Sequence, residues 1–514
     1  MLNRRTIALL ALFSAVFAAA VVAAFGSGSA NAGAEARAKG AAAVPATALA
    51  YASINLDRNG TQFQALEDLA GKVQGGASAV GKVNQMLDGD GQQAQIVRAL
   101  GGDVSVGLVG ISLTSGAMPG VEAVMVATAA DERALPAVLT KAGFAPGPEL
   151  NGQPVWEKDA FAITLNGSTA IGATSRATLG EALAVQAGDQ PALADDAAFK
   201  ATIAKLPGDA VAVAYLAPAR LAGLVQVAGS LLPQGALPKG APDMGQSLAQ
   251  LSATLKDVRG LGIAITAEQG GLRVVAAGDA DQAALERLGA SLPTAYTPTI
   301  LAQIPANALG FAAFRDLGPM LQSALRTAQT QDSQVKSLLG AAEQTTGIKL
   351  DDLLAALGGE HAIVAVGGKT PAAALLTQPQ DPAAAGATLA TALTAAEKLG
   401  TGLPGAKELQ KRLPGTPPQI AVTRQGDSAT LAIGTDPQLA ATPSSSIADA
   451  DAYRAIVDRA GVPAQVTGLA YVNAAQLRAQ AQTIGTTVPA GTDAINGVVA
   501  WGTADGATIF VSIG

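Results

Sequence analysis

The stretch VPATALAYASINLDR, residues Val44–Arg58, returns later in the chain as IPANALGFAAFRDLG, residues Ile304–Gly318. Self-similarity of this kind is the signature of an internal repeat. Three more pairs of segments follow in the same order and at nearly the same offset: LGGDVSVGLVG (Leu100–Gly110) with LGGEHAIVAVG (Leu357–Gly367), LADDAAFKATI (Leu193–Ile203) with IADADAYRAIV (Ile447–Val457), and AVAYLAPARL (Ala212–Leu221) with GLAYVNAAQL (Gly468–Leu477). The shared order and spacing predict two copies of one structural unit.

Each copy consists of short apolar strands joined by tight turns, with helical segments between the hairpins. In the first copy, Asn166-Gly167 is the strongest short hairpin signal, and Gly101-Gly102 ends a helix before the next strand. Tight turns join antiparallel neighbours. We therefore expect an α+β fold, built as two tandem copies of a mostly antiparallel sheet unit with helices packed on one face.

The matched segments also set the expected boundaries. We predict a first α+β repeat at residues 44–283 and a second at residues 304–514. Residues 284–303 would link them. Residues 33–43, rich in alanine and glycine, are predicted to form a flexible tether.

Residues 1–32 bear on location. The positive segment Met1–Arg5 precedes the uncharged run Thr6–Phe25, and Ala30-Asn31-Ala32 fits the small-x-small rule for signal cleavage. The run is longer than a usual signal core, and at about 1.5 Å per residue it could also span a bilayer as a helix. Two interpretations stay open, a cleaved export signal or a retained N-terminal membrane anchor. Both put the rest of the chain outside the cytoplasm, secreted or in the cell envelope.

Composition restricts the classes of partner. The net charge is −7, and no basic run follows residue 40, so nucleic acid is not an expected partner. Aromatic residues are only 3% of the chain, which leaves few platforms for stacking sugars or bases. The sequence has no cysteine, which excludes disulfides, thiolate metal sites and cysteine nucleophiles.

Residues suited to catalysis are few and scattered. His361, the one histidine, aligns with Val104 of the first copy, so we interpret it as a structural or surface residue. Gly368–Thr370 lacks the upstream glycine of a phosphate loop, and Gly400–Gly405 follows a helix where a dinucleotide motif needs a strand. Ser333–Lys336 has the S-x-x-K spacing without its companion motifs. We predict no catalytic, cofactor-binding or metal-binding residue.

Acidic and aromatic residues recur in both copies. Asp195-Asp196 and the pair Asp449 and Asp451 stand at predicted helix starts, where the helix dipole favours negative charge. A calcium loop would need more oxygen ligands and a following glutamate. Tyr215 and Tyr471 are expected to be core residues with satisfied hydroxyl groups.

The pattern P-A-x-x-L-A-Y-x-S-x-N-L-D of Pro45–Asp57, together with the LGGD step and the paired hairpins, resembles the bacterial family known as domain of unknown function 3352. The order of elements is similar over most of Val44–Gly514. The resemblance implies an exported or membrane-anchored protein that faces the cell exterior. It implies no chemistry, because the family has no established activity. The second copy departs from the opening pattern, with Phe311 in place of Tyr51.

Three classes of function follow as hypotheses. The favoured one is a non-enzymatic extracytoplasmic protein of the cell envelope that binds or scaffolds an envelope protein. The alternative is a carrier of a lipid or other apolar ligand, because Leu221–Leu232 and Leu350–Leu357 are rich in leucine and alanine and could border an apolar cleft. The third is a hydrolase that uses carboxylates or a serine–lysine pair. Membrane contact is expected through Thr6–Phe25 only if that segment is not cleaved.

Overall fold

The described part of the chain covers most of the residues that follow the expected export segment. The computed structural model describes residues 34–73, 98–112, 120–223, 255–280, 294–318, 347–400, 419–434 and 443–514, except residues 56, 369–371, 380, 426–427, 484, 486–491 and 505. Between these ranges only scattered residues are described. Residues 1–32 and the Ser333–Lys336 motif lie outside the described residues, as does most of Gly400–Gly405.

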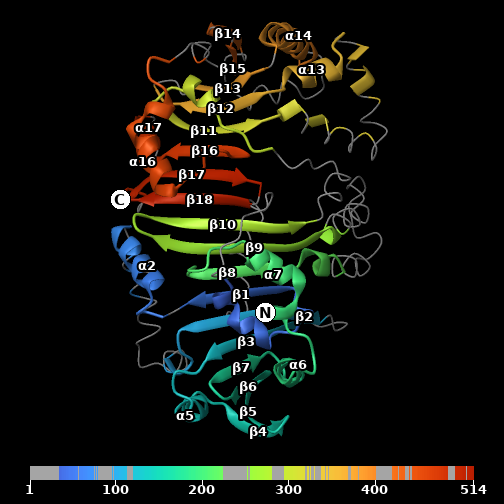
Figure 1. Ribbon diagram of the computed structural model, residues 1–514, viewed down its shortest axis with the longest axis vertical. Helices are drawn as coiled ribbons and strands as arrows, with labels where there is room; N and C mark the ends of the chain where they lie inside the picture. The colour runs from blue at the N-terminus through green and yellow to red at the C-terminus, as the bar shows by residue number, and fades with distance from the viewer. Residues whose placement is uncertain are drawn as a thin grey trace. The chain divides into compact units, whose positions relative to one another are not determined.

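The chain divides into two compact units. The first comprises Met1–Asp281 and the second Gln282–Ala504, and the end of the chain is divided between them. All the strand pairings described are antiparallel, which confirms an α+β fold with a large antiparallel sheet component (Figure 1). Among the described residues, no helix combines the length and the apolar character that crossing a membrane requires.

The first unit contains a sheet with the strand order β4–β5–β6–β7–β3–β2–β1–β8–β9–β10. Its strands are β1 (Ala50–Asn55), β2 (Asp103–Ser112), β3 (Gly120–Thr128), β4 (Ala145–Leu150), β5 (Gln153–Lys158), β6 (Phe161–Asn166), β7 (Thr169–Ala173), β8 (Ala212–Leu216), β9 (Val258–Glu268) and β10 (Gly271–Ala280). Its helices are η1 (Ala34–Ala43), α2 (Thr61–Lys72), α5 (Leu135–Lys141), α6 (Arg176–Ala187), η2 (Leu193–Asp195) and α7 (Ala197–Ile203).

Both predicted glycine signals are confirmed. Gly167 has φ of 57° in the turn between β6 and β7, a conformation that favours glycine. Gly101 has φ of 71°, and a Cβ there would lie 2.5 Å from the carbonyl oxygen of Thr128. Both positions therefore need a residue without a side chain, for conformation at Gly167 and for conformation and space at Gly101.

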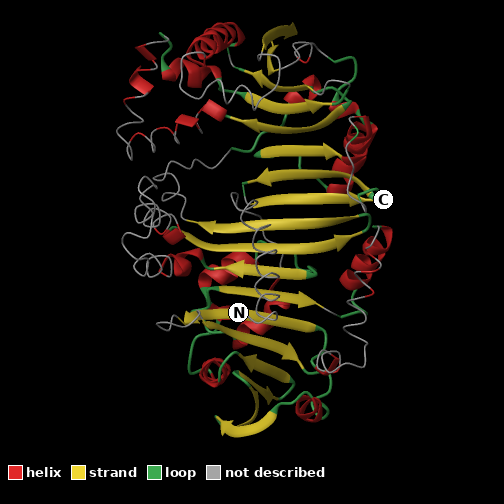
Figure 2. Ribbon diagram, turned by 180° about the vertical axis from the view of Figure 1, so that it is seen from behind, coloured by secondary structure: helices red, strands yellow, loops and turns green. Residues whose placement is uncertain are grey.

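The helices of this unit cover both faces of its sheet, so the prediction of helices on one face is wrong here. Successive residues of a strand point to opposite faces. On β3, Val126 belongs to a core cluster with Leu179 of α6, whereas Ala127 belongs to another cluster with Leu135 of α5. Both faces of these strands are apolar, and each needs a cover. Figure 2 shows the helices in red against the strands in yellow.

The hairpin of β4 and β5 was not predicted. Its first strand has the sequence APGPEL, and two prolines in six residues indicate a loop more often than a strand. In the described pairings β4 contacts only β5, so it lies at an edge of the sheet. Proline is tolerated there, because one side of an edge strand needs no backbone donors.

The predicted flexible tether is also wrong for its later half. Ala38, Ala41 and Ala43 of η1 are buried in the core of the first unit. The carbonyl of Val44, which follows, accepts a hydrogen bond of 2.7 Å from the backbone N–H of Leu193. Small apolar side chains pack closely against a sheet, so an alanine-rich segment need not remain free of it.

The second unit has the strand order β14–β15–β13–β12–β11–β16–β17. Its strands are β11 (Ala308–Arg315), β12 (Glu360–Val366), β13 (Ala372–Gln378), β14 (Gln419–Gln425), β15 (Ser428–Gly434), β16 (Gly468–Asn473) and β17 (Ile495–Thr503). The last strand, β18 (Gly506–Ile513), is divided between the two units. The helices of the second unit include η3 (Ile300–Gln303), α13 (Leu350–Ala356), α14 (Pro382–Gly400), η5 (Ile447–Asp449), α16 (Asp451–Ala460) and α17 (Ala474–Thr483). The predicted linker 284–303 ends inside this core, because Ile300 is fully buried there.

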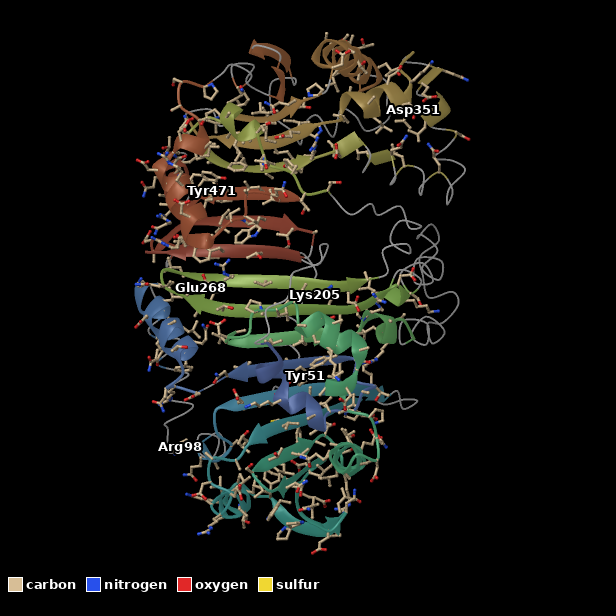
Figure 3. The ribbon with its side chains drawn as sticks, in the orientation of Figure 1. Tyr51, Arg98, Lys205, Glu268, Asp351 and Tyr471 are labelled. Carbon is tan, nitrogen blue, oxygen red and sulfur yellow. The ribbon has the colours of Figure 1, made fainter. Side chains whose placement is uncertain are left out.

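One tyrosine is fully enclosed on a central strand of each unit. Tyr51 on β1 is 0% exposed and Tyr471 on β16 is 1% exposed (Figure 3). Each belongs to the main apolar cluster of its own unit. The cores therefore form around the strands that the repeat had marked.

Candidate functional site

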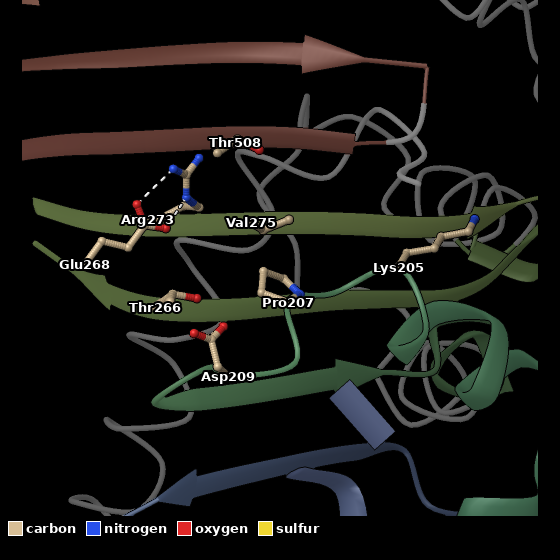
Figure 4. Close-up of a pocket in the computed structure, with 8 residues that line it drawn as sticks. All are labelled: Lys205, Pro207, Asp209, Thr266, Glu268, Arg273, Val275 and Thr508. Atoms are coloured by element: carbon tan, nitrogen blue, oxygen red, sulfur yellow. Dashed lines mark hydrogen bonds and ion pairs between the residues drawn. The ribbon is translucent and has the colours of Figure 1, made fainter. Parts of the chain in front are cut away.

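A cleft on the first unit brings together side chains of both charges (Figure 4). Its volume is about 340 Å³, near the lower end of the range for small-molecule sites. It is lined by Lys205, Pro207, Asp209, Thr266, Glu268, Arg273, Val275 and Thr508, the last in a short segment that clusters with the first unit.

The floor of the cleft is the hairpin of β9 and β10. In the register of this hairpin Thr266 pairs with Arg273 and Ala264 pairs with Val275. Because side chains alternate between faces, Thr266, Glu268, Arg273 and Val275 share one face of the hairpin. The loop between α7 and β8 carries the remaining wall, with Lys205, Pro207 and Asp209 at alternate positions.

Two of the charged side chains in the cleft neutralise each other. The guanidinium of Arg273 donates to both carboxylate oxygens of Glu268, with an Nη2 to Oε2 distance of 2.8 Å. The Arg273 side chain is 19% exposed and the Glu268 side chain 30% exposed. A partly buried bidentate pair of this kind has a defined geometry and holds both side chains in place.

The other two charged groups have neutral partners. The ammonium of Lys205 donates to the carbonyl of Gly278 at 2.7 Å. The carboxylate of Asp209 accepts from the amide Nε2 of Gln62 at 3.1 Å. The described part of the chain provides no ion pair for either group. Lys205 and Asp209 therefore keep their charges available to the cleft.

Gln62 connects helix α2 to the cleft. It is buried, and its Oε1 accepts a hydrogen bond of 2.8 Å from the backbone N–H of Ala267 on β9. The side chain thus satisfies a strand donor while its amide holds Asp209. Both ribbon views draw α2 beside the strand ends of this region (Figures 1 and 2). The position of the Asp209 carboxylate therefore depends on the docking of α2.

Thr266 contributes an unsatisfied hydroxyl. The residue is 3% exposed, and its Oγ1 has no hydrogen-bond partner in the described structure. Leaving a buried hydroxyl unpaired costs on the order of 1–3 kcal/mol. A polar ligand atom in the cleft would offset this cost.

The one histidine belongs to the second unit and lies in its interior. His361 is fully buried, its Nε2 lies 2.7 Å from the carbonyl oxygen of Leu357, and its ring stacks on Phe314. Burial lowers the pKa of His361, an effect that the hydrogen bond to Leu357 and the charge of Asp316 partly oppose. The side chain is therefore a neutral core residue near pH 7.

The recurring acidic residues lie at helix starts, as predicted. Asp196 is the N-cap of α7, and its carboxylate accepts from the backbone N–H of Phe199 at 2.8 Å. Asp451 lies in the first turn of α16. Within the described residues, no three histidine, cysteine or acidic side chains gather closely enough to hold a metal ion.

The two repeated tyrosines are core residues, but only one has the satisfied hydroxyl that we expected. The Tyr215 hydroxyl donates to the carbonyl of Arg259 at 3.5 Å. The Tyr471 hydroxyl is buried and has no partner among the described atoms. Burial raises the pKa of Tyr471 to about 12, so both tyrosines stay protonated near neutral pH.

Sequence reasoning missed every residue of the cleft. One signal was present in the final hairpin of the first copy, where Thr266, Glu268 and Arg273 bring polar side chains together on one face of two largely apolar strands. No sequence signal linked them to Lys205 and Asp209, because that juxtaposition depends on where the loop before β8 crosses the sheet.

A family model with the description "Protein of unknown function (DUF3352)" matches residues 149–498, which is more than half of the chain. The chain belongs to DUF3352. This membership confirms the resemblance inferred from the sequence. The match to DUF3352 begins after Pro45–Asp57, so it depends on the later elements and not on the opening pattern. The cleft residues Lys205, Asp209 and Arg273 lie inside the DUF3352 match.

Other comparisons add little to the DUF3352 assignment. No curated protein matches the chain. Solved structures of TP0453 in crystal forms III, IV and I are each 10% identical to it, with TM-scores of 0.26, 0.25 and 0.24. They cover 51%, 48% and 51% of this chain and 90%, 83% and 88% of their own. Likeness at this level carries no inference about fold or function.

Proposed function

We propose that this protein is a non-enzymatic binding protein that works outside the cytoplasm and holds a small polar ligand in the cleft of its first unit. The observation that carries the proposal is the arrangement of charge. Arg273 and Glu268 bind each other, while Lys205 and Asp209 are held by neutral partners. Fixed groups of opposite charge in a concave site orient a polar ligand.

The chemistry of the cleft favours binding over catalysis. A nucleophilic hydroxyl needs a general base within hydrogen-bond reach. In the described structure the Thr266 hydroxyl has no hydrogen-bond partner, so it lacks an activating base. The histidine that could have served as a base packs on Phe314 in the second unit. These observations support the non-enzymatic hypothesis over a hydrolase.

A polar ligand suits this cleft better than a lipid. Of the lining side chains only Pro207 and Val275 are apolar, and four are charged. Covering charged groups with an apolar ligand removes water without replacing its hydrogen bonds, which is unfavourable. We therefore place a carrier of apolar ligand second and a hydrolase third.

Export is the second part of the proposal. Its support is the sequence of residues 1–32, where a positive start, an uncharged run and a small-x-small site occur in the order used by secreted proteins. A protease-accessibility assay on intact host cells after outer-layer permeabilisation tests it. Protection of the chain until the inner membrane is lysed would show that it is cytoplasmic.

We also propose that the two units are copies of one ancestral α+β unit. The support is the position of equivalent strands. β1 pairs with β2 and β8, while β11 pairs with β12 and β16. The segment before the first strand of each unit is also similar. Pro45 forms an isolated antiparallel β-bridge with Ala192, and Pro305 forms one with Ser446. Superposing experimental coordinates of the two units, each taken alone, tests the proposal, and different strand connectivity would contradict it.

The binding proposal is tested by equilibrium dialysis of the purified full chain against a small-molecule extract of its host. Retained compounds are measured by mass spectrometry for the wild type, for Asp209→Trp, which fills the cleft from an exposed position, and for the exposed control Asp189→Trp. We expect retention by the wild type and the control and loss in Asp209→Trp. Retention of nothing, or equal retention by Asp209→Trp, would refute a ligand site in this cleft.

A further inference from the structure

The sheets of the two units end differently on one side. In the first unit β7 pairs with β3 and with β6, and in the second β15 pairs with β13 and with β14, so β14 has the position of β6. The outer side of β6 pairs with β5. Within the described residues β14 pairs with β15 alone, and Figure 1 draws it beyond β15 at the end of that unit's sheet. The second unit therefore has an open strand edge where the first unit has another strand.

The open edge keeps about half of its backbone hydrogen-bonding groups for a further strand. β14 has seven residues, and alternate residues of an antiparallel strand direct their N–H and C=O groups to opposite sides. Natural proteins protect such edges with proline or with charged residues. The edge strand β4 of the first unit has Pro146 and Pro148, whereas β14 has no proline and one charged residue, Arg424. The edge of β14 is thus suited to pair with an added strand.

The first unit shows how such a strand would align. Ala162 on β6 and Gln419 on β14 are equivalent, because each pairs with the last residue of the neighbouring strand. Val155 of β5 pairs with Thr164, two residues after Ala162. In the same register, an added strand would place its counterpart of Val155 opposite Ala421.

β14 also sets the length and the charge of the added strand. Its hairpin with β15 has seven residue pairs, against five between β6 and β7. The two extra positions on β14 are Arg424 and Gln425. Opposite charges directly across antiparallel strands attract each other. A complementary strand therefore pairs along all of β14 and has an acidic residue opposite Arg424.

The sequence before β14 disfavours a strand supplied by the chain itself. β5 and β6 are joined by a tight turn in which Asp159, three residues before the position equivalent to Gln419, has φ of 54°. The residue three positions before Gln419 is Thr416, and a proline follows it. A β-branched residue rarely has positive φ, and a residue before proline prefers extended backbone. Residues 401–418 lie outside the described residues, and their sequence is unsuited to the turn that the first unit uses.

We infer that the edge of β14 binds an extended segment of another protein, which adds to the sheet antiparallel to β14 as β5 does to β6. The bound segment pairs along all of β14 and has an acidic residue opposite Arg424. Main-chain hydrogen bonds provide the affinity, and the residue opposite Arg424 provides part of the specificity. This surface belongs to the second unit and does not require a ligand in the cleft of the first.

Disulfide trapping tests the edge and its register, because the chain has no cysteine of its own. The full-length variant Ala421→Cys is incubated in a thiol redox buffer with a synthetic peptide of residues Asn151–Lys158. The peptide carries Gly152→Glu as its acidic residue and Val155→Cys as its trap. Residues directly opposite each other on antiparallel strands lie close enough for a disulfide. We expect the mixed disulfide to form.

Two controls make the trapping specific. The first is the same peptide with the cysteine at Trp156 and valine kept at Val155, so that the cysteine faces the opposite side of the sheet. The second is the variant Ala145→Cys on β4, the edge of the first unit that contains prolines. We expect each control to give at least about fivefold less mixed disulfide. Equal yields from the two peptides, or at the two edges, would overturn the inference.

Hydrogen exchange of the wild-type chain gives the same decision without a substitution in the protein. The β14 amide groups that point away from β15 should exchange quickly in the free chain. They should exchange at least about tenfold more slowly with excess peptide that has Gly152→Glu and no cysteine. Slow exchange of all β14 amides in the free chain would overturn the inference, because the chain would then cover its own edge. Protection that rises with protein concentration would also overturn it and assign the edge to a second copy.

Arg424→Ala tests the acidic residue of the segment. It should weaken binding of the peptide with Gly152→Glu about two- to fivefold and leave binding of the peptide with Gly152 unchanged. Arg454→Ala is the matched control, because this exposed arginine pairs with Asp451 on α16. Peptide binding is measured by fluorescence anisotropy. Equal weakening of both peptides, or of neither, would overturn the role given to Arg424.

Discussion

The aromatic clusters of the two units have the same three positions and different hydroxyl groups. The rings are Tyr51, Phe199 and Tyr215 in the first unit and Phe311, Tyr453 and Tyr471 in the second. In each unit the ring on the helix packs nearly perpendicular to a tyrosine ring on a strand. The ring centroids are 5.0 Å apart for Phe199 and Tyr215 and 5.1 Å apart for Tyr453 and Tyr471. Packing therefore requires an aromatic ring at each position, while the presence of a hydroxyl group on that ring depends on the hydrogen-bond partners nearby.

The surroundings of the first ring explain why one unit has tyrosine there and the other phenylalanine. The Tyr51 hydroxyl donates to Ser105 at 2.9 Å, and Ser105 donates to Ser53 at 3.2 Å. In the register of the second unit, alanines 313 and 362 stand where the two serines stand in the first. The second unit lacks the whole hydroxyl chain. Removing all partners together leaves no buried polar group unpaired, whereas removing one does.

The opposite change occurs on the other face of the same strands. One cross-strand row is Ile54, Val104 and Ala127 in the first unit and Phe314, His361 and Thr377 in the second. The second row is polar and incompletely satisfied, because His361 Nδ1 and Thr377 Oγ1 have no partner in the described structure. The comparison shows that these strands can carry a row of polar side chains on either face of the sheet. The cost in folding free energy depends on whether those side chains form hydrogen bonds.

The largest expected effect comes from removing the central ring of each cluster. Phe199→Ala and Tyr453→Ala should each lower the free energy of unfolding of their own unit by about 3–5 kcal/mol, through lost burial and the cavity left behind. Urea denaturation can follow the units separately, because the chain has two tryptophans, Trp156 in the first and Trp501 in the second.

The matched control for these ring deletions is Phe161→Ala, since Phe161 is 41% exposed on β6. It should change the free energy of unfolding by less than about 1 kcal/mol. A loss this small for either central ring would show that the two clusters are not equivalent cores.

The second prediction concerns pH. Burial sets the pKa of His361 in the folded unit below the ordinary value of 6.5, which the unfolded chain retains. Between those two pKa values the unfolded chain binds a proton that the folded unit does not. The stability contribution is complete above about pH 6.5 and falls as the pH drops toward the folded pKa, by up to about 1.4 kcal/mol per pH unit.

The variant His361→Val, which installs the residue found at Val104, should remove this pH dependence. Urea denaturation monitored at Trp501 would compare both proteins at pH 7.5 and 5.5. The wild type should lose more stability than the variant on acidification. If the difference in free energy of unfolding between the two proteins is the same at both pH values, His361 binds a proton as readily in the folded state as in the unfolded state.

The third prediction concerns the hydroxyl chain of the first unit. Tyr51→Phe should lower the free energy of unfolding by about 1–2 kcal/mol, because the Ser105 hydroxyl loses its donor. Adding Ser53→Ala and Ser105→Ala reproduces the second unit and should restore part of that loss, so the three effects are not additive. Tyr215→Phe is the control, since its bond of 3.5 Å to Arg259 is long. The opposite outcome is a fall in the free energy of unfolding of the triple variant by the full sum of the three single effects. In that case, losing all three hydroxyl groups together does not explain why the second unit tolerates phenylalanine at this position.

The smallest expected effect is at the start of the equivalent helices. Asp196 caps α7, and Ala450 occupies the matching N-cap of α16 without a side-chain bond. Asp196→Ala should cost about 1 kcal/mol or slightly more, because it also removes the ion pair with Arg220. Asp196→Asn keeps the cap and should lower the free energy of unfolding by less.

The reverse change in the second unit, Ala450→Asp, should stabilise that unit by about 0.5–1 kcal/mol in thermal or urea denaturation. No gain there would show that the two helix starts differ in geometry.

Elements defined by short-range signals were predicted well. The hairpin turn at Asn166-Gly167 and the helix cap at Asp196 each follow from a few neighbouring residues and their backbone preferences. The hairpin of β4 and β5 was missed because its prolines contradict strand propensity, and only its edge position makes them acceptable. The burial of η1 was missed because alanine content does not say whether a segment finds a surface to cover.

The sequence by itself determined the family, the α+β class and the positions of most strands, since alternation, glycine turns and caps act within a few residues. Only the tertiary structure decided that Lys205 and Asp209 line one cleft with Thr266 and the Arg273–Glu268 pair, and that His361 is buried against Phe314. Those juxtapositions depend on how distant segments cross and on which face each side chain takes. A charged side chain has the same identity on a solvated loop as in a cleft, and its surroundings alone make it part of a site.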